Sequence, residues 1–90
     1  MVSLQDMKNY LRVDTSEDDL LIEGLLSSSE RLCMDIARED DKEKFWKFEN
    51  ASVAVMYTAA YLYEHREEAD HHDLTMTLRS LLFSAREGGF

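Results

Sequence analysis

The chain has 90 residues, enough for one domain, and a domain of this size buries only about 60% of the surface that its unfolded form exposes. Hydrophobic residues make up 44% of the chain and charged residues 32%, a balance that favours a packed core over disorder. The formal net charge is −9, which argues against any partner held by bulk attraction to nucleic-acid phosphates.

The residue types favour an all-α fold. The chain has no proline and only three glycines, so it lacks the turn-forming residues that usually separate strands and close hairpins. No apolar stretch approaches the roughly 20 residues of a membrane span, and no secretory signal is visible at the N-terminus. The single cysteine, Cys33, is expected to be a small apolar core residue in a protein that matures in a reducing cytoplasm.

The first half of the chain predicts a short helix and then a long one. Ser3, with Asp6 three residues later, predicts a capping box at the start of a helix over 4–11. A second helix is predicted over 17–38, because three carboxylates follow Ser16 and an apolar stripe then continues at helical spacing.

A small-residue segment and a charged connection come next. Gly24 and the serines at 27–29 are poor helix formers that allow another backbone to come close. The mixed-charge run 39–44 is predicted to be a connection, and an alanine-rich stripe then predicts a third helix over 46–67. This third helix is expected to be the central one and to pack closely on the second.

The C-terminal third predicts a polar loop and a last short helix. Residues 64–73 form a polar helix end and a loop, and Thr75 or Thr77 is expected to cap a helix over 75–86. The tail 87–90 is expected to be mobile. The prediction is therefore a single domain, residues 1–90, built as a small bundle of about four helices that are short, long, long and short.

The negative charge is concentrated in two blocks. Residues 14–30 carry six acids and no base, and residues 64–73 carry five acids and one base. Arg79 and Arg86 lie seven residues apart on one face of the last predicted helix, where they could meet a complementary acidic surface. For Arg86 the alternative is a favourable interaction with the helix dipole in the last turn.

No pattern of catalytic or metal-binding residues stands out. His65, His71 and His72 lie close to two aspartates, but adjacent histidines in an acidic segment match no structural zinc spacing, and a solvated loop is the better interpretation. The aspartates near residue 18 lack the ligand alternation of a calcium loop. Without a nucleophile–base motif or a glycine-rich phosphate loop, we expect no enzyme activity, no metal and no cofactor.

Three stretches in register resemble one protein family. These are the opening, residues 3–14 followed by the acidic 17–21, then Ala59–Glu67, and finally Leu78–Arg86, in which a leucine pair precedes an arginine. The chain resembles the gp6-like head-tail connector (adaptor) proteins of tailed phages over nearly its whole length. It departs from them at the start of the central helix, where the family commonly has a proline and this chain has an aromatic cluster, Phe45, Trp46 and Phe48.

The resemblance implies a structural subunit in the neck of the virion, assembled in the host cytoplasm. Its implied partners are further copies in a ring that is twelvefold in the virion, the portal protein, and a stopper or tail-completion protein, with DNA passing through the channel without specific binding. No membrane partner is expected. The candidate residues for the subunit or portal interface are Arg79, Arg86, Asp18, Asp19, Glu23, Tyr61 and Arg66.

Two other functions remain compatible with the residues alone. One is a generic acidic helical adaptor that binds a protein partner through the small-residue face of its second helix. The other is a DNA mimic that blocks a nucleic-acid-binding protein, which would need carboxylates spaced like phosphates along one surface.

Overall fold

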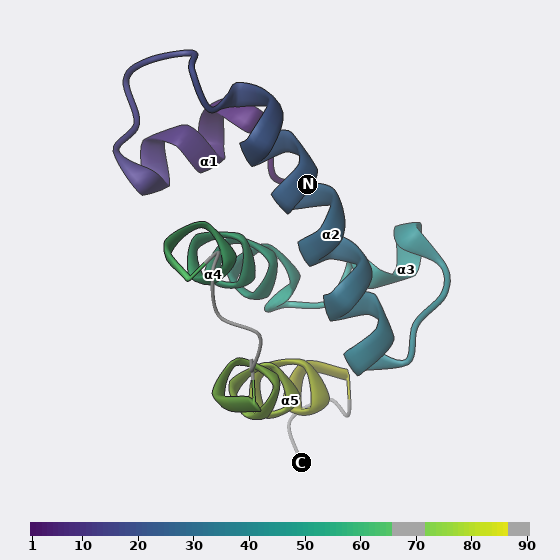
Figure 1. Ribbon diagram of the computed structural model, residues 1–90. Helices are drawn as coiled ribbons and strands as arrows, with labels where there is room; N and C mark the ends of the chain where they lie inside the picture. The colour runs from purple at the N-terminus through teal and green to yellow at the C-terminus, as the bar shows by residue number, and fades with distance from the viewer. Residues whose placement is uncertain (66–71, 87–90) are drawn as a thin grey trace.

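The computed structural model describes the backbone of residues 1–65 and 72–86, and the side chains as far as residue 82. Within these residues the protein is all helical and contains no strand, as predicted (Figure 1). The five helices in this described part are α1 (Leu4–Leu11), α2 (Asp19–Ala37), α3 (Lys42–Phe45), α4 (Ala51–Glu64) and α5 (His72–Arg86).

Local signals set both ends of α1, and its predicted bounds are confirmed. The Ser3 hydroxyl accepts a hydrogen bond from the Asp6 backbone N–H at 3.0 Å, while the Asp6 carboxylate accepts one from the Ser3 N–H at 3.2 Å. The helix ends because Arg12 adopts a left-handed conformation, φ 61°, in which its N–H bonds back to the Asn9 carbonyl.

The second helix is slightly shorter than predicted. It begins at Asp19 and ends at Ala37, where Arg38 adopts a left-handed conformation with φ 57°. Ser16 does not cap this helix through its hydroxyl; its backbone carbonyl instead accepts from the Asp19 N–H at 3.4 Å. The N-terminal turn is therefore built by backbone bonds, and the nearby carboxylates are free to make contacts elsewhere.

The prediction for residues 39–67 was wrong about where helices begin. Asp41, inside the predicted connection, accepts hydrogen bonds from the backbone N–H groups of Glu43 and Lys44, and this cap starts the short helix α3. Phe45, at the end of α3, is fully buried. The chain therefore turns at the aromatic cluster so that Phe45 enters the core. The central helix α4 begins only after this turn, at Ala51.

The last helix begins earlier than predicted. It starts at His72, so Thr75 and Thr77 lie inside α5 and neither is its cap. The expected mobile tail, residues 87–90, lies outside the described residues.

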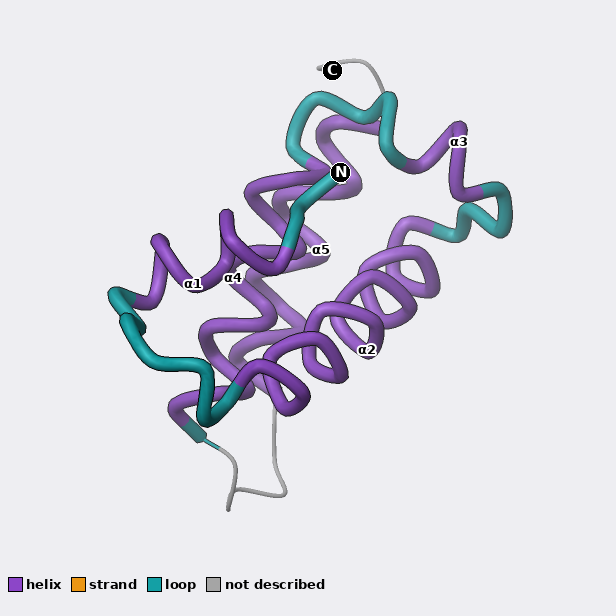
Figure 2. The backbone as a smooth tube through the Cα atoms, turned by 90° about the horizontal axis from the view of Figure 1, so that it is seen from above, coloured by secondary structure: helices purple, strands orange, loops and turns teal. Residues whose placement is uncertain are grey.

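Helix α2 packs most extensively on α4 and next on α5. In the views of Figures 1 and 2, α1, α4 and α5 lie on one side of α2. The alanines Ala51, Ala54 and Ala59 are buried on α4, which confirms the close helix packing expected from its composition.

The buried side chains form two clusters. The larger one joins α2, α3, α4 and α5 and includes Cys33, Phe45, Leu74 and Leu78. The smaller one consists of Met7, Ile22 and Ala59 and attaches α1. No helix in the part of the chain that the structure describes is long and apolar enough to cross a bilayer.

Candidate functional site

Two of the acidic candidate residues hold the subunit together. The Lys8 ammonium lies 2.8 Å from the Asp19 carboxylate, which joins α1 to α2. The Tyr63 hydroxyl donates a hydrogen bond of 2.7 Å to the Asp18 carboxylate, which joins the start of α2 to α4. Glu23 lies one turn further along α2 and is exposed. Its carboxylate is therefore accessible to a partner molecule.

The candidates at the end of α4 are described only in part. Tyr61 is half-buried and its ring stacks on the His65 ring, with centroids 4.2 Å apart. The Nδ1 atom of His65 lies 2.9 Å from the Tyr61 carbonyl oxygen and donates to it when it carries the proton. Arg66 lies outside the described residues.

The basic candidates are on α5. Arg79 is exposed, and no ion pair joins it to another described residue. Arg86 is the last residue of α5, and its side chain lies outside the described part of the chain. Among the described residues, the structure therefore does not pair Arg79 with the acidic residues near the start of α2.

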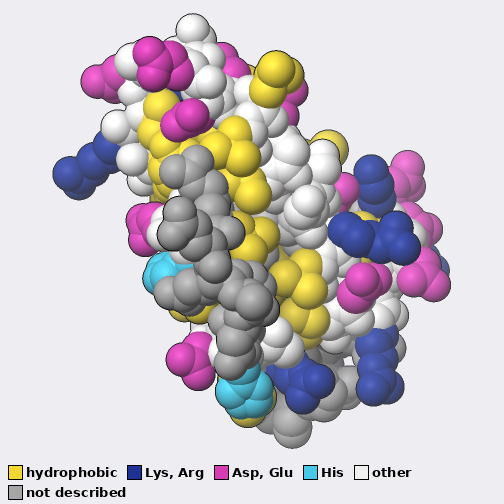
Figure 3. All heavy atoms as spheres, in the orientation of Figure 1, with side chains coloured by type: hydrophobic (Ala, Val, Ile, Leu, Met, Phe, Trp, Pro, Cys, Tyr) yellow, Lys and Arg dark blue, Asp and Glu magenta, His cyan; other side chains and the backbone are white. Residues whose placement is uncertain are grey.

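Charge is distributed unevenly over the surface. Figure 3 shows Asp and Glu side chains around α1 and the start of α2, and Lys and Arg side chains beside α3, mixed with acids, and near α5. A basic side chain also projects beside α1, so side chains of both signs occur at both ends of the subunit.

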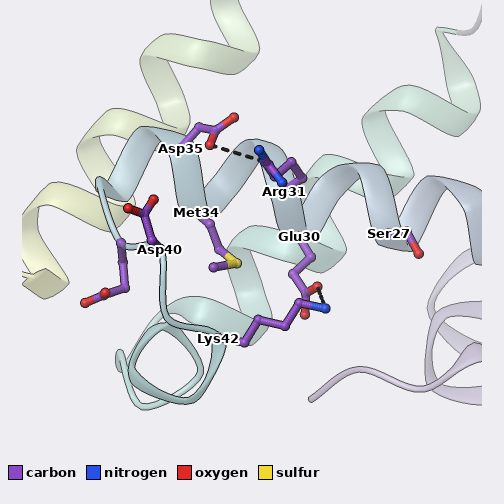
Figure 4. Close-up of a pocket in the computed structure, with 8 residues that line it drawn as sticks. Ser27, Glu30, Arg31, Met34, Asp35, Asp40 and Lys42 are labelled. Atoms are coloured by element: carbon purple, nitrogen blue, oxygen red, sulfur yellow. Dashed lines mark ion pairs between the residues drawn. The ribbon is translucent and has the colours of Figure 1, made fainter.

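A polar hollow of about 450 Å³ lies between α2 and α3. In Figure 4 the side chains of Glu30 and Lys42 point toward one another, and their charged atoms are 3.2 Å apart. The indole N–H of Trp46 donates to the other oxygen of the same carboxylate at 2.7 Å. Glu30 therefore links α3 to α2, and both oxygens of its carboxylate are engaged in this structural contact. The hollow is lined by Ser27, Glu30, Arg31, Met34, Asp35, Glu39, Asp40 and Lys42.

An apolar surface between α1 and α4 was missed in the sequence. Val53 is 58% exposed and Tyr57 36% exposed on α4, and Tyr10 is 52% exposed on α1. Two hollows meet at Tyr10, one of about 510 Å³ and one of about 580 Å³. The larger is lined by Tyr10, Leu11, Arg12, Tyr57, Ala60, Tyr61, Glu64 and His65. The sequence did contain one indication of this surface, because residues 51–64 are apolar on every side of the predicted helix.

A family model for phage gp6-like head-tail connector proteins matches residues 1–87. The chain belongs to this family. Searches of curated proteins and of solved structures gave no match. The match confirms the resemblance seen in the three sequence stretches, and it identifies the chain as a member of a family of phage structural proteins, not of enzymes.

The buried polar groups of this connector are structural. Cys33 is fully buried, as expected, and burial raises the pKa of its thiol from 9.0 to about 11 despite a 3.5 Å contact with the Thr58 hydroxyl. A thiol held protonated is a poor nucleophile. No group of side chains among the described residues could hold a metal ion, and the expected loop histidine His71 lies outside that part of the chain.

Proposed function

We propose that this connector assembles into a closed ring beneath the portal at the capsid vertex, joins the capsid to the tail and lets DNA pass through its centre. A twelvefold ring would match a twelvefold portal, and a stopper or tail-completion protein would bind its far side. The subunit would assemble in the host cytoplasm and act in the neck of the virion. Membership of the head-tail connector family supports this proposal.

The observation that carries the proposal is the exposed face of α4. A helix that is apolar on every side is normally buried on every side. In the single subunit, however, Val53 and Tyr57 remain exposed on the outer face of α4. Assembly would cover this face and add burial to a chain whose own core is small.

Ring closure also needs two different faces on each subunit, because a head-to-tail contact repeats around a closed circle. Glu23 on α2 and Arg79 on α5 are exposed groups of opposite charge and are our candidates for contacts with a neighbour or with the portal. Arg86, Arg66 and Tyr61 remain candidates from the sequence. Asp18 and Asp19 are weaker candidates, since each already has a partner within the subunit.

The overall charge is compatible with a DNA channel. A net charge of −9 disfavours adhesion to phosphates, so DNA could slide past without specific binding. This role needs no cofactor, no metal and no membrane.

Sedimentation with purified portal protein tests the proposal. The wild-type chain should co-sediment as a multiple of its 10.5 kDa mass. Arg79→Glu should weaken that association, whereas Lys47→Glu, the same charge change at another exposed position, should leave it unchanged. A wild-type chain that never co-sediments with the portal would contradict the proposed function, and an unchanged Arg79→Glu profile would remove Arg79 from the interface.

A further inference from the structure

One leucine projects from the outer face of α2. Leu20 is 85% exposed, although it stands in a helix whose other leucines are at least half-buried. Ser29 follows it by nine residues, about two and a half turns, and is fully buried. Leu20 therefore points away from the core. Single exposed leucines are common on protein surfaces, so exposure alone assigns it no role.

The surroundings of Leu20 suit close approach by another helix. Gly24 lies one turn further along the same face, and a Cβ placed there would meet nothing within 4 Å. Ser27 and Ser28 are exposed beyond it, and the carboxylate of Glu23 is exposed beside it. This face, defined by Leu20, Glu23 and Gly24, is called the α2 ridge.

Leu20 lies on the face of α2 that is turned away from the core, whereas the hollow between α1 and α4 lies on the side of α2 where those two helices pack (Figures 1 and 2). Val55 is buried and precedes Tyr57 by two residues, which turn the helix by about 200°, so Tyr57 points away from the core. The hollow is walled by Tyr10, Tyr57 and Tyr61 with Ala60 between them, and at about 580 Å³ it has room for an aliphatic side chain. It is called the α4 hollow.

We propose that the α2 ridge of one copy docks into the α4 hollow of the next, with the Leu20 side chain inserted among the tyrosines. This inference rests on the ring proposed above and names the surfaces that would form it. Because the two surfaces face opposite ways, each copy would offer one to each neighbour, as a head-to-tail ring requires.

Charge favours this pairing. Arg12 lies on the rim of the hollow, is exposed, and has no ion pair with another described residue. Docking would bring the Glu23 carboxylate of the neighbour toward it. Glu64 is also on the rim, so the rim is not uniformly basic, and Arg12 would act as the specific partner that fixes the register of the contact.

Disulfide trapping tests the pairing in the full-length chain. A double variant, Leu20→Cys with Ala60→Cys, places one thiol on the ridge and one in the lining of the hollow while keeping the three tyrosines. Mild oxidation should produce a ladder of linked chains longer than dimers on a non-reducing gel. The matched control, Leu20→Cys with Ser80→Cys, moves the second thiol to the exposed face of α5 and should give dimers at most. The native Cys33 is buried and can stay in both variants.

The outcomes separate this inference from the proposed function. Oxidation is carried out with and without portal protein, and portal co-sedimentation of the wild-type chain is measured in parallel. A ladder specific to the ridge–hollow pair supports the inference even if the portal is not bound, in which case only the proposed function fails. Portal binding without a ladder, or equal ladders from both variants, overturns the inference and leaves the connector function intact.

Discussion

Leu20 and Ile22 are two residues apart on α2, yet we expect opposite consequences from truncating them. Ile22 is fully buried in the cluster that attaches α1, where it packs with Met7 and Ala59. Ile22→Ala should cost about 2–5 kcal/mol of unfolding free energy, since the cavity adds to the lost transfer energy. A chain of this length has a total of roughly 5–14 kcal/mol, so the loss should be a large share of it.

Leu20→Ala should instead leave the unfolding free energy within about 0.5 kcal/mol of wild type, because the side chain is 85% exposed. Its effect should appear in assembly. Burying a leucine contributes about 2 kcal/mol, which corresponds to an association constant about 30-fold weaker at each interface when the side chain is removed.

Two measurements separate these effects. Urea unfolding followed by circular dichroism, at a concentration low enough to keep the chain monomeric, reports the stability of the subunit. Sedimentation over a concentration series reports the association. If Leu20→Ala destabilises the monomer as much as Ile22→Ala does, the assignment of the two faces of α2 is wrong; if it leaves association unchanged, Leu20 does not lie in the interface.

Three further changes test the internal contacts. Ser3→Ala removes the cap of α1 and should cost about 1 kcal/mol in the same urea assay, an effect that Ser3→Asp should largely avoid. Trp46→Phe deletes the 2.7 Å hydrogen bond to Glu30 and should cost about 1.5–3 kcal/mol; no loss would mean that this bond does not hold α3 in place. The raised pKa of the Cys33 thiol keeps its proton in the folded state, so stability should be intact below pH 9 and should fall as the pH rises toward 11. Relative to Cys33→Ala, the wild type should lose about 1 kcal/mol between pH 8 and pH 10 in urea titrations, and an equal loss in both proteins would contradict this.

The elements that could be predicted from the sequence are those set by neighbouring residues. Helix α1 was predicted with its observed bounds because its cap, Ser3 with Asp6, acts within one turn. The stripe of α2 was also recognisable, because its apolar positions repeat over several turns. In both cases the information lies within a few residues of the structure that it determines.

The start of α4 could not be predicted in the same way. The aromatic residues before it have helical spacing, but burying Phe45 in the larger core cluster requires the chain to turn, and only the tertiary packing shows this. The short helix α3 was missed because its charged residues resemble a solvated connection. Its cap at Asp41 and the link from Lys42 to Glu30 stabilise it instead.

The sequence predicted a candidate site made of charged residues, and the structure adds an exposed apolar surface to it. Block counting correctly found acidic residues near the start of α2, but it could not show that Asp18 and Asp19 have partners inside the subunit. It also could not show which leucine of the stripe points outward, because that depends on where α4 and α5 lie. The exposed apolar surface depends on how the helices pack, and the sequence indicated it only through residues 51–64, which are apolar on every side of the helix.

The division of the core suggests why assembly and folding would be coupled in this protein. The end that carries α1 has three fully buried residues with partly buried apolar neighbours and the Lys8–Asp19 ion pair, while the other end has the larger cluster of fully buried residues. Leu20 and the α4 hollow both lie at the α1 end, so a neighbour docking there would add burial where the single subunit has least. Contacts between copies would then stabilise α1 and the loop that follows it more than the rest of the chain.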